Sequence, residues 1–367
     1  MKLRNAALCA TAALALTAGL AQAEPRELTY GAYTSPTHTT NVYGIRPSQE
    51  RITKDTNGEI TFENFAGGAM GGPKDLLSNV GSGILDAASV VDIYVKSSLP
   101  TAAMVSSMLA IGHNPKVMAA ATNEFQLLHC PQCIEERTEN NVIGLSWSAT
   151  GAYHVICKEP IKTLADLQGK KIRATSGVGI AMLNIGAAPV SITTAEMYEA
   201  MQRGQIDCAV GAAAWLDTYN LKDYAKGIWS NPVGSYFGTM NWAINLDVWN
   251  ELTEEQRGAF KMEMAQNVAD IMWAYVDDND KALEWLANNG GVVEESDQAF
   301  KDAWAAEEAK AYETALAGAQ KDGIENAEAL LNTYKELVAK WTAKMEEIGN
   351  DKDAYRQALQ DEIFSKI

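Results

Sequence analysis

The sequence predicts an α/β protein with a helical C-terminal region, and three observations support this. Strand-like and helix-like segments alternate up to Val210, with Gly-rich turns between them. Three capping boxes, beginning at Thr163, Thr193 and Thr253, mark helix starts. After Ser296 the chain becomes rich in Ala, Glu and Lys, with apolar residues at helical spacing. The length suits two domains or one large one.

The first part of the chain alternates in a βαβαβ order. The elements predicted here are a strand (28–33), a helix (39–56), a strand (60–65), a helix from Lys74 and a strand (86–91). This order predicts an open sheet whose short loops face a ligand. The Gly-rich loop at 67–72 lacks the Lys-Ser/Thr ending of a phosphate loop and does not fit G-x-G-x-x-G. We therefore predict a tight turn there, although its amides suit an anion.

The middle of the chain repeats this order, and the end is helical. Two predicted helices follow Thr163 and Thr193 and end at Gly169 and Gly204. The predicted strands of this part are 171–175 and 206–210. Amphipathic helices at the C-terminus predict packing on the domains, with a dimerisation surface as the alternative.

The N-terminus has the pattern of a cleavable signal peptide over residues 1–23. Lys2 and Arg4 precede an uncharged run, and Ala21-Gln22-Ala23 forms an A-x-A cleavage site. A membrane anchor is the alternative, but the run is short. Cys9 follows Leu8 rather than a small residue, so no lipid anchor is expected. We predict an exported, soluble mature chain of residues 24–367 with no direct membrane insertion.

The charge of the chain argues against nucleic acid and anionic lipid as partners. The whole sequence has a net charge of −17, which becomes −19 when Lys2 and Arg4 are removed. Such a surface repels polyanions. An anionic ligand therefore needs a local positive group.

Four cysteines remain after the predicted cleavage: Cys130, Cys133, Cys157 and Cys208. An even number in an oxidising compartment predicts one or two disulfides, and three pairings are allowed. The Cys130-Pro131-Gln132-Cys133 motif favours a structural disulfide or inert thiols. A redox pair and a zinc site that includes His129 are the alternatives, although a zinc site would lack a fourth ligand.

Motifs of catalysis are missing from the sequence, but one arginine has a position that suits a ligand. There is no G-x-S-x-G elbow and no H-E-x-x-H. Four histidines are scattered, at positions 38, 113, 129 and 154. Arg173 ends a short predicted strand just before a Ser-Gly-Val-Gly turn, so it can reach the carboxyl edge of the sheet. Its guanidinium matches a carboxylate or sulfonate bidentately.

Several segments resemble one protein family. Pro160 to Arg173 (PIKTLADLQGKKIR) resembles the signature of solute-binding proteins of tripartite ATP-independent periplasmic (TRAP) transporters, the DctP-like family. Similar matches follow at 186–190 and 196–207. Further matches are the GSGILD turn at 81–86 and the return strand and helix in 242–253. The resemblance covers nearly the whole mature chain.

The resemblance implies a type II-like periplasmic binding protein fold: two α/β lobes with hinge strands, a long connecting helix and a helical C-terminus. By analogy, lobe one holds 24–150 and 238–280, and lobe two holds 151–237 and 281–367. The family's arginine that matches Arg173 pairs with a carboxylate of the substrate. The implied function is a periplasmic receptor that delivers a small organic anion to the small and large membrane subunits of a sodium-coupled permease.

Two departures from the family pattern modify the expected ligand. Tyr153 occupies the place of a second arginine, and Gly211 that of an asparagine. A monocarboxylate, aromatic or otherwise, or a sulfonate therefore fits better than a C4-dicarboxylate. Besides Arg173, Tyr153 and Gly211, the candidate ligand residues are Trp147, Trp215, Tyr94, Met240 and Asn241. We expect no enzyme activity, cofactor or metal; an exported thiol-redox protein using Cys130 and Cys133, or a sensory binding protein, is the alternative.

Overall fold

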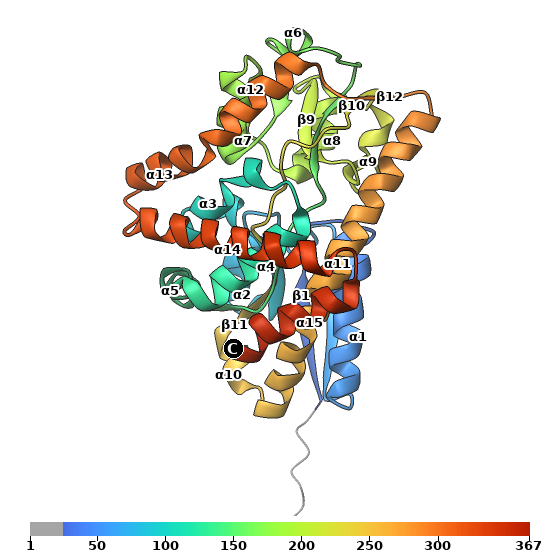
Figure 1. Cartoon of the computed structure of the whole chain (residues 1–367). Coiled ribbons are helices and arrows are strands. Elements are labelled where there is room, and N and C mark those ends of the chain that lie inside the picture. Colours follow the sequence, from blue (N-terminus) through green and yellow to red (C-terminus); the bar gives the residue numbers. More distant parts are fainter. Residues whose placement is uncertain (1–24) are drawn as a thin grey trace, which may run out of the picture.

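The computed structural model describes residues 25–367 and contains two six-stranded sheets, each covered by helices (Figure 1). The predicted signal peptide lies outside the described residues. The mixed α/β fold with a helical C-terminus confirms the predicted fold class. Within residues 25–367, no helix is long and apolar enough to cross a membrane.

The first sheet has the order β2-β1-β3-β11-β4, with β5 also paired to β11. Its strands are β1 (Arg26–Gly31), β2 (Ile60–Phe65), β3 (Ala87–Val91), β4 (Val142–Gly144), β5 (Trp147–Ser148) and β11 (Thr239–Asn245). β1 is parallel to β2 and β3, whereas β11 is antiparallel to β3. The helices of this half are α1 (Arg46–Asp55), α2 (Leu76–Gly81), α3 (Pro100–Ser106), α4 (Pro115–Glu124), α5 (Pro131–Glu139) and α10 (Leu246–Glu251).

The second sheet has the order β12-β10-β6-β9-β7-β8. Its strands are β6 (Tyr153–Cys157), β7 (Lys171–Arg173), β8 (Ala188–Val190), β9 (Cys208–Ala212), β10 (Gly227–Trp229) and β12 (Val292–Glu294). Its helices are α6 (Leu164–Leu167), α7 (Ser176–Asn184), α8 (Met197–Gln202) and α9 (Trp215–Thr218). We call the two halves the first-sheet lobe and the second-sheet lobe.

The local signals of the sequence account for several element boundaries. All three capping boxes are formed, at Thr163, Thr193 and Thr253. The predicted helix over 39–56 begins instead as a π-helix (Thr40–Ile45) and continues as α1. The strand predicted over 171–175 ends at Arg173, because Thr175 already serves as the N-cap of α7.

A 35-residue helix, α11 (Glu254–Asn288), runs along both lobes (Figure 1). It contacts α1 and α4 in the first-sheet lobe and α9 and β12 in the second-sheet lobe. Both lobes thus contact one long helix. Besides α11 and the C-terminal helices, the chain crosses between the lobes at residues 149–152 and 230–238.

The C-terminal helices pass from the second-sheet lobe to the first-sheet lobe. They are α12 (Gln298–Ala309), α13 (Ala311–Lys321), α14 (Ala327–Ile348) and α15 (Lys352–Glu362). α12 packs on α7, α13 on α3, α14 on α4 and α15 on α11. These contacts place α14 and α15 against elements of the first-sheet lobe. The sequence assigned 281–367 to lobe two, and the lobe boundaries stay a prediction.

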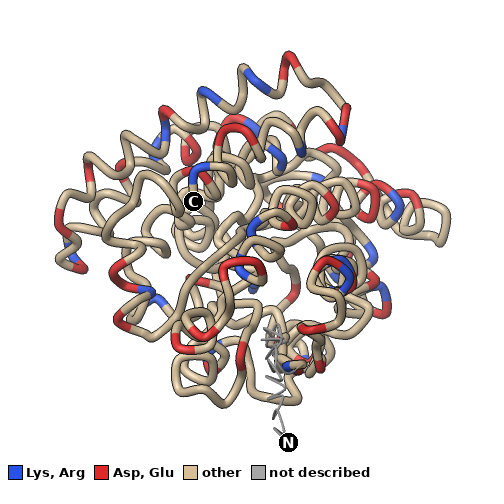
Figure 2. Tube along the Cα trace, turned by 90° about the horizontal axis from the view of Figure 1, so that it is seen from below, with Lys and Arg blue, Asp and Glu red and all other residues tan. Residues whose placement is uncertain are grey.

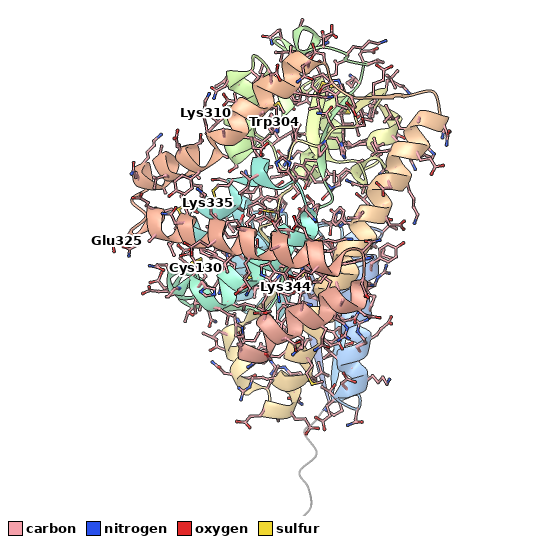
Figure 3. All side chains as sticks on the ribbon, in the orientation of Figure 1. Cys130, Trp304, Lys310, Glu325, Lys335 and Lys344 are labelled. Atoms are coloured by element: carbon pink, nitrogen blue, oxygen red, sulfur yellow. A yellow bond between two sulfur atoms is a disulfide. The ribbon has the colours of Figure 1, made fainter. Side chains whose placement is uncertain are left out.

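Both disulfides lie in buried positions. Cys157 joins Cys208, its cross-strand partner between β6 and β9, and Cys130 joins Cys133 at the start of α5. Figure 3 shows Cys130 in the half of the molecule that contains α14. Because the pair is oxidised and 0% exposed, these cysteines do not form the zinc site considered above.

Candidate functional site

Arg173 is a buried cation, and its partners in the protein are uncharged. It ends β7 at the carboxyl edge of the second sheet and is 2% exposed. Its Nε donates to the Ile192 carbonyl at 3.1 Å and its Nη1 to the Val210 carbonyl at 3.3 Å; its Nη2 donates to the Tyr94 hydroxyl at 3.0 Å. Among residues 25–367 no carboxylate pairs with it. A guanidinium has five N–H groups, so two remain to hold one anionic group.

The guanidinium lies in the wall of a small, nearly filled cavity of about 40 Å³ between the two lobes. The wall is rich in aromatic side chains from both lobes. They are Tyr33, Tyr94, Tyr153, Trp215, Tyr219, Tyr236 and Tyr275. His38 and several Ser and Thr hydroxyls complete the lining. A flat or short apolar body with a polar end matches such a wall.

Tyr94 connects the two lobes at the arginine. It follows β3 in the first-sheet lobe, and its hydroxyl accepts from Arg173 and from the backbone N–H of Thr194, each at 3.0 Å. The Thr194 hydroxyl in turn donates to Tyr33 and accepts from Tyr219. These contacts join residues of both lobes, so the conformation is closed around the cavity.

Trp215 forms the aromatic surface beside the arginine. Its ring lies 5.7 Å from the Arg173 guanidinium carbon, and its edge-to-face partner Tyr153 has a centroid distance of 5.1 Å. A Cβ on Gly211 would lie 2.1 Å from the indole. The glycine in the family's asparagine position therefore makes room for this ring.

Behind the cavity wall, Asp92 fixes one of the tyrosines. The Tyr236 hydroxyl donates to Asp92 Oδ1 at 2.5 Å, and Ser106 donates to the same oxygen at 2.7 Å. Burial raises the pKa of Asp92 from 3.8 to about 7. The proton of Tyr236 is thus committed to a group outside the cavity.

The predicted site residues separate into two groups. Arg173, Tyr94, Tyr153 and Trp215 line this cavity, and Gly211 shapes it. Trp147 and Met240 instead line a smaller cavity beside Arg137, and Asn241 holds buried main-chain and side-chain contacts with Tyr30 and Ser148.

Five aromatic residues of the wall were not predicted from the sequence: Tyr33, His38, Tyr219, Tyr236 and Tyr275. They come from segments far apart in the chain and lie in no shared motif. Tyr219 follows a short helix after β9, and Tyr275 is in the middle of α11. Arg173 was found because it ends a predicted strand, but these five residues have no such position in the sequence that would predict a place in the site.

Comparisons with known proteins all find bacterial solute-binding proteins among the matches. The model of the bacterial extracellular solute-binding protein family 7 (DctP) matches residues 31–318. A solute-binding protein of Albidiferax ferrireducens is 24% identical over 268 residues, 70% of this chain and 76% of its own length. A monocarboxylate 2-oxoacid-binding periplasmic protein of Nostoc is 26% identical over 67% of this chain and 68% of its own. The uncharacterized protein YiiZ of Salmonella typhimurium is 29% identical, but the match spans only 49% of its length.

Solved structures share the fold. A TRAP solute-binding protein from Rhodoferax ferrireducens with copurified benzoate has a TM-score of 0.77 at 17% identity. The match covers 87% of this chain and 99% of that one. A TRAP protein from Bordetella bronchiseptica with bound mandelate has a TM-score of 0.73 at 21% identity, covering 86% and 99%. Because the family model matches most of the sequence and the fold agrees, the chain belongs to the DctP family of bacterial extracellular solute-binding proteins, the binding proteins of TRAP transporters.

Proposed function

We propose that this protein is a periplasmic receptor that captures one small organic monoanion, a carboxylate or sulfonate, between its two lobes. The observation that carries the proposal is Arg173, a buried guanidinium in a cavity wall whose partners are all uncharged. A buried charge is costly unless it is paired, and a bound anion supplies the missing partner. The benzoate, mandelate and 3-hydroxybenzoate in similar structures support an acid as the ligand.

The charges of the cavity support a single negative charge on the ligand. Arg173 is the one Lys or Arg side chain among the described residues that line it, and no Asp or Glu does so. Burial lowers the pKa of His38, the other titratable nitrogen in the wall, to about 4, so this ring is neutral at pH 7. A second carboxylate on the ligand would therefore be buried without a counter-charge.

The aromatic lining supports a compact, largely apolar body for this anion. Tyr153 and Trp215 meet edge to face, and Trp215 meets Tyr219 in the same way at 5.5 Å. Such rings offer apolar surface with little conformational entropy to lose. Arg173, Tyr94, Tyr153 and Trp215 are therefore the ligand-binding residues that we propose.

Membership of the family supports a proposal for the place of action and for the partners. We propose export through the signal peptide at 1–23, and delivery of the acid to the small and large membrane subunits of a sodium-coupled permease. Asp and Glu residues are spread over the helices in Figure 2. This negative charge suits a protein that stays in an aqueous compartment, and it argues against binding to nucleic acid. The fully buried Cys130–Cys133 disulfide does not favour a thiol-redox function.

A thermal-shift screen of monocarboxylates, sulfonates and C4-dicarboxylates tests this proposal. We expect a rise in Tm with at least one monoanion, because a ligand that binds only the folded state stabilises it. Arg173→Ala should abolish this rise. The control Arg203→Ala removes an exposed arginine that pairs with Glu199 and should leave the rise unchanged. A ligand-induced rise that persists in Arg173→Ala would exclude the proposed anchor.

A further inference from the structure

The hydroxyl of Tyr275 makes two polar contacts in the wall of the cavity, with Trp215 and His38. Tyr275 is in α11, lines the cavity and is 2% exposed. The Trp215 indole Nε1–H donates to its oxygen at 3.4 Å, and the oxygen lies 3.3 Å from His38 Nε2. Which atom donates in the second contact depends on the tautomer of His38.

The contacts of His38 determine that tautomer. The backbone N–H of Thr40 donates to Nδ1 at 3.3 Å, and the Thr40 hydroxyl lies 2.8 Å from the same nitrogen. From the Thr40 N–H we assign Nδ1 as an acceptor, which in a neutral ring places the proton on Nε2. Burial keeps the ring neutral by lowering the pKa of His38 to about 4. Nε2–H consequently donates to Tyr275.

With two donors on its oxygen, Tyr275 must direct its own O–H elsewhere. Within the described chain, residues 25–367, no hydrogen bond donated by this hydroxyl is found. Two other tyrosines of the wall have an acceptor for their hydroxyl proton, because Tyr236 donates to Asp92 and Tyr219 donates to Thr194. The hydroxyls of Tyr94 and Tyr33 belong to the network around Arg173, where they accept from Arg173 and from the Thr194 hydroxyl. Tyr275 is thus a donor that belongs to the cavity but not to the arginine network.

We propose that Tyr275 is a specificity residue that donates to an uncharged acceptor oxygen on the body of the bound monoanion. This inference rests on the proposed function, in which Arg173 holds the carboxylate. The preferred ligands are then acids with a carbonyl or ether oxygen besides the carboxylate. A ligand donor at this place would meet an oxygen already approached by two N–H groups, and a second carboxylate would find no cation.

Two pairs of acids of nearly equal shape test this inference. 4-Oxopentanoate is compared with 4-methylpentanoate, and 3-acetylbenzoate with 3-isopropylbenzoate, by isothermal titration calorimetry. Each pair exchanges an acetyl group for an isopropyl group, so it changes an acceptor oxygen into a methyl group. We expect the wild-type protein to bind the acetyl member about tenfold more tightly in at least one pair, because a site built to hydrogen-bond an oxygen discriminates against its absence.

Tyr275→Phe should weaken both members, because the Trp215 and His38 N–H groups lose their acceptor, but it should weaken the acetyl member about tenfold more and so remove the preference. The matched control Tyr355→Phe also removes a buried hydroxyl, one that donates to the Lys116 carbonyl outside the cavity lining, and should keep the preference. Because the wild-type preference is itself a test, a Tyr275→Phe protein that fails to fold does not prevent a decision.

The outcomes distinguish this inference from the proposed function. Equal binding of both members in every pair, or a preference that survives Tyr275→Phe, overturns the role of Tyr275 while Arg173-dependent binding stands. Binding of these acids that persists in Arg173→Ala overturns the anchor. If the wild-type protein binds none of the four acids, the inferred ligand class is wrong, and the broader thermal-shift screen decides on the receptor itself.

Discussion

Removing the Tyr94 hydroxyl tests whether closure of the lobes is coupled to the arginine. In Tyr94→Phe, Arg173 Nη2 and the Thr194 N–H both lose an acceptor at 3.0 Å in the closed conformation. Each buried donor left without a partner costs about 1 kcal/mol or more, so the closed state loses about 2 kcal/mol. In an open cleft, water satisfies both groups, and the loss therefore falls on the bound state.

We expect the Kd of Tyr94→Phe to rise about 30-fold for the tightest-binding acid of the thermal-shift screen, since about 1.4 kcal/mol corresponds to a factor of ten. Isothermal titration calorimetry measures this directly. Tyr355→Phe is again the matched control; it should lower Tm without changing Kd, because its hydroxyl bonds to Lys116 outside the cleft. A Tyr94→Phe protein that binds within threefold of wild type would refute this coupling.

Three further perturbations test other parts of the account. Gly211→Ala places a methyl group 2.1 Å from the Trp215 ring, so both Tm and acid affinity should fall; unchanged affinity would show that the indole position is unimportant. Asp92→Asn should gain stability relative to wild type as the pH rises from about 4 to 7 in urea unfolding. The folded wild-type protein holds a proton on Asp92 up to about pH 7, whereas the unfolded chain releases it near pH 3.8, so the wild-type free energy of unfolding falls between these two pH values. A difference in unfolding free energy between Asp92→Asn and wild type that does not change with pH would contradict the raised pKa of Asp92. Replacing both Cys130 and Cys133 by Ser should leave acid affinity within about twofold, as titration calorimetry can check, because this buried pair lies outside the cavity; a large loss would reopen a role for it in function.

The local signals in the sequence were sufficient for several elements and for the choice of Arg173 as the proposed anchor. Capping boxes fix helix starts through contacts within four residues, so Thr163, Thr193 and Thr253 were identifiable without tertiary structure. Arg173 was identifiable because a strand end next to a Gly-containing turn faces the ligand edge of a sheet, and because its segment resembles the family signature.

The rest of the cavity depends on tertiary structure. Trp147 and Trp215 are both large aromatic residues near strand ends, yet only Trp215 lines the cavity, while Trp147 packs near Arg137. Tyr33 and Tyr275 reach the site because α11 and the two lobes bring distant segments together. Amphipathic spacing likewise predicted that α14 and α15 bury one face, but it did not specify that they pack on α4 and α11.

The central claim is that the cavity neutralises one negative charge and no more. Calorimetric titration with succinate against succinamate, and with isophthalate against 3-carbamoylbenzoate, tests it directly, because each pair keeps its shape and replaces a carboxylate by a neutral amide. We predict that in every pair that binds, the mono-amide binds about tenfold more tightly or better, and that Arg173→Ala abolishes its binding. A dicarboxylate that binds more tightly than its mono-amide would contradict the account.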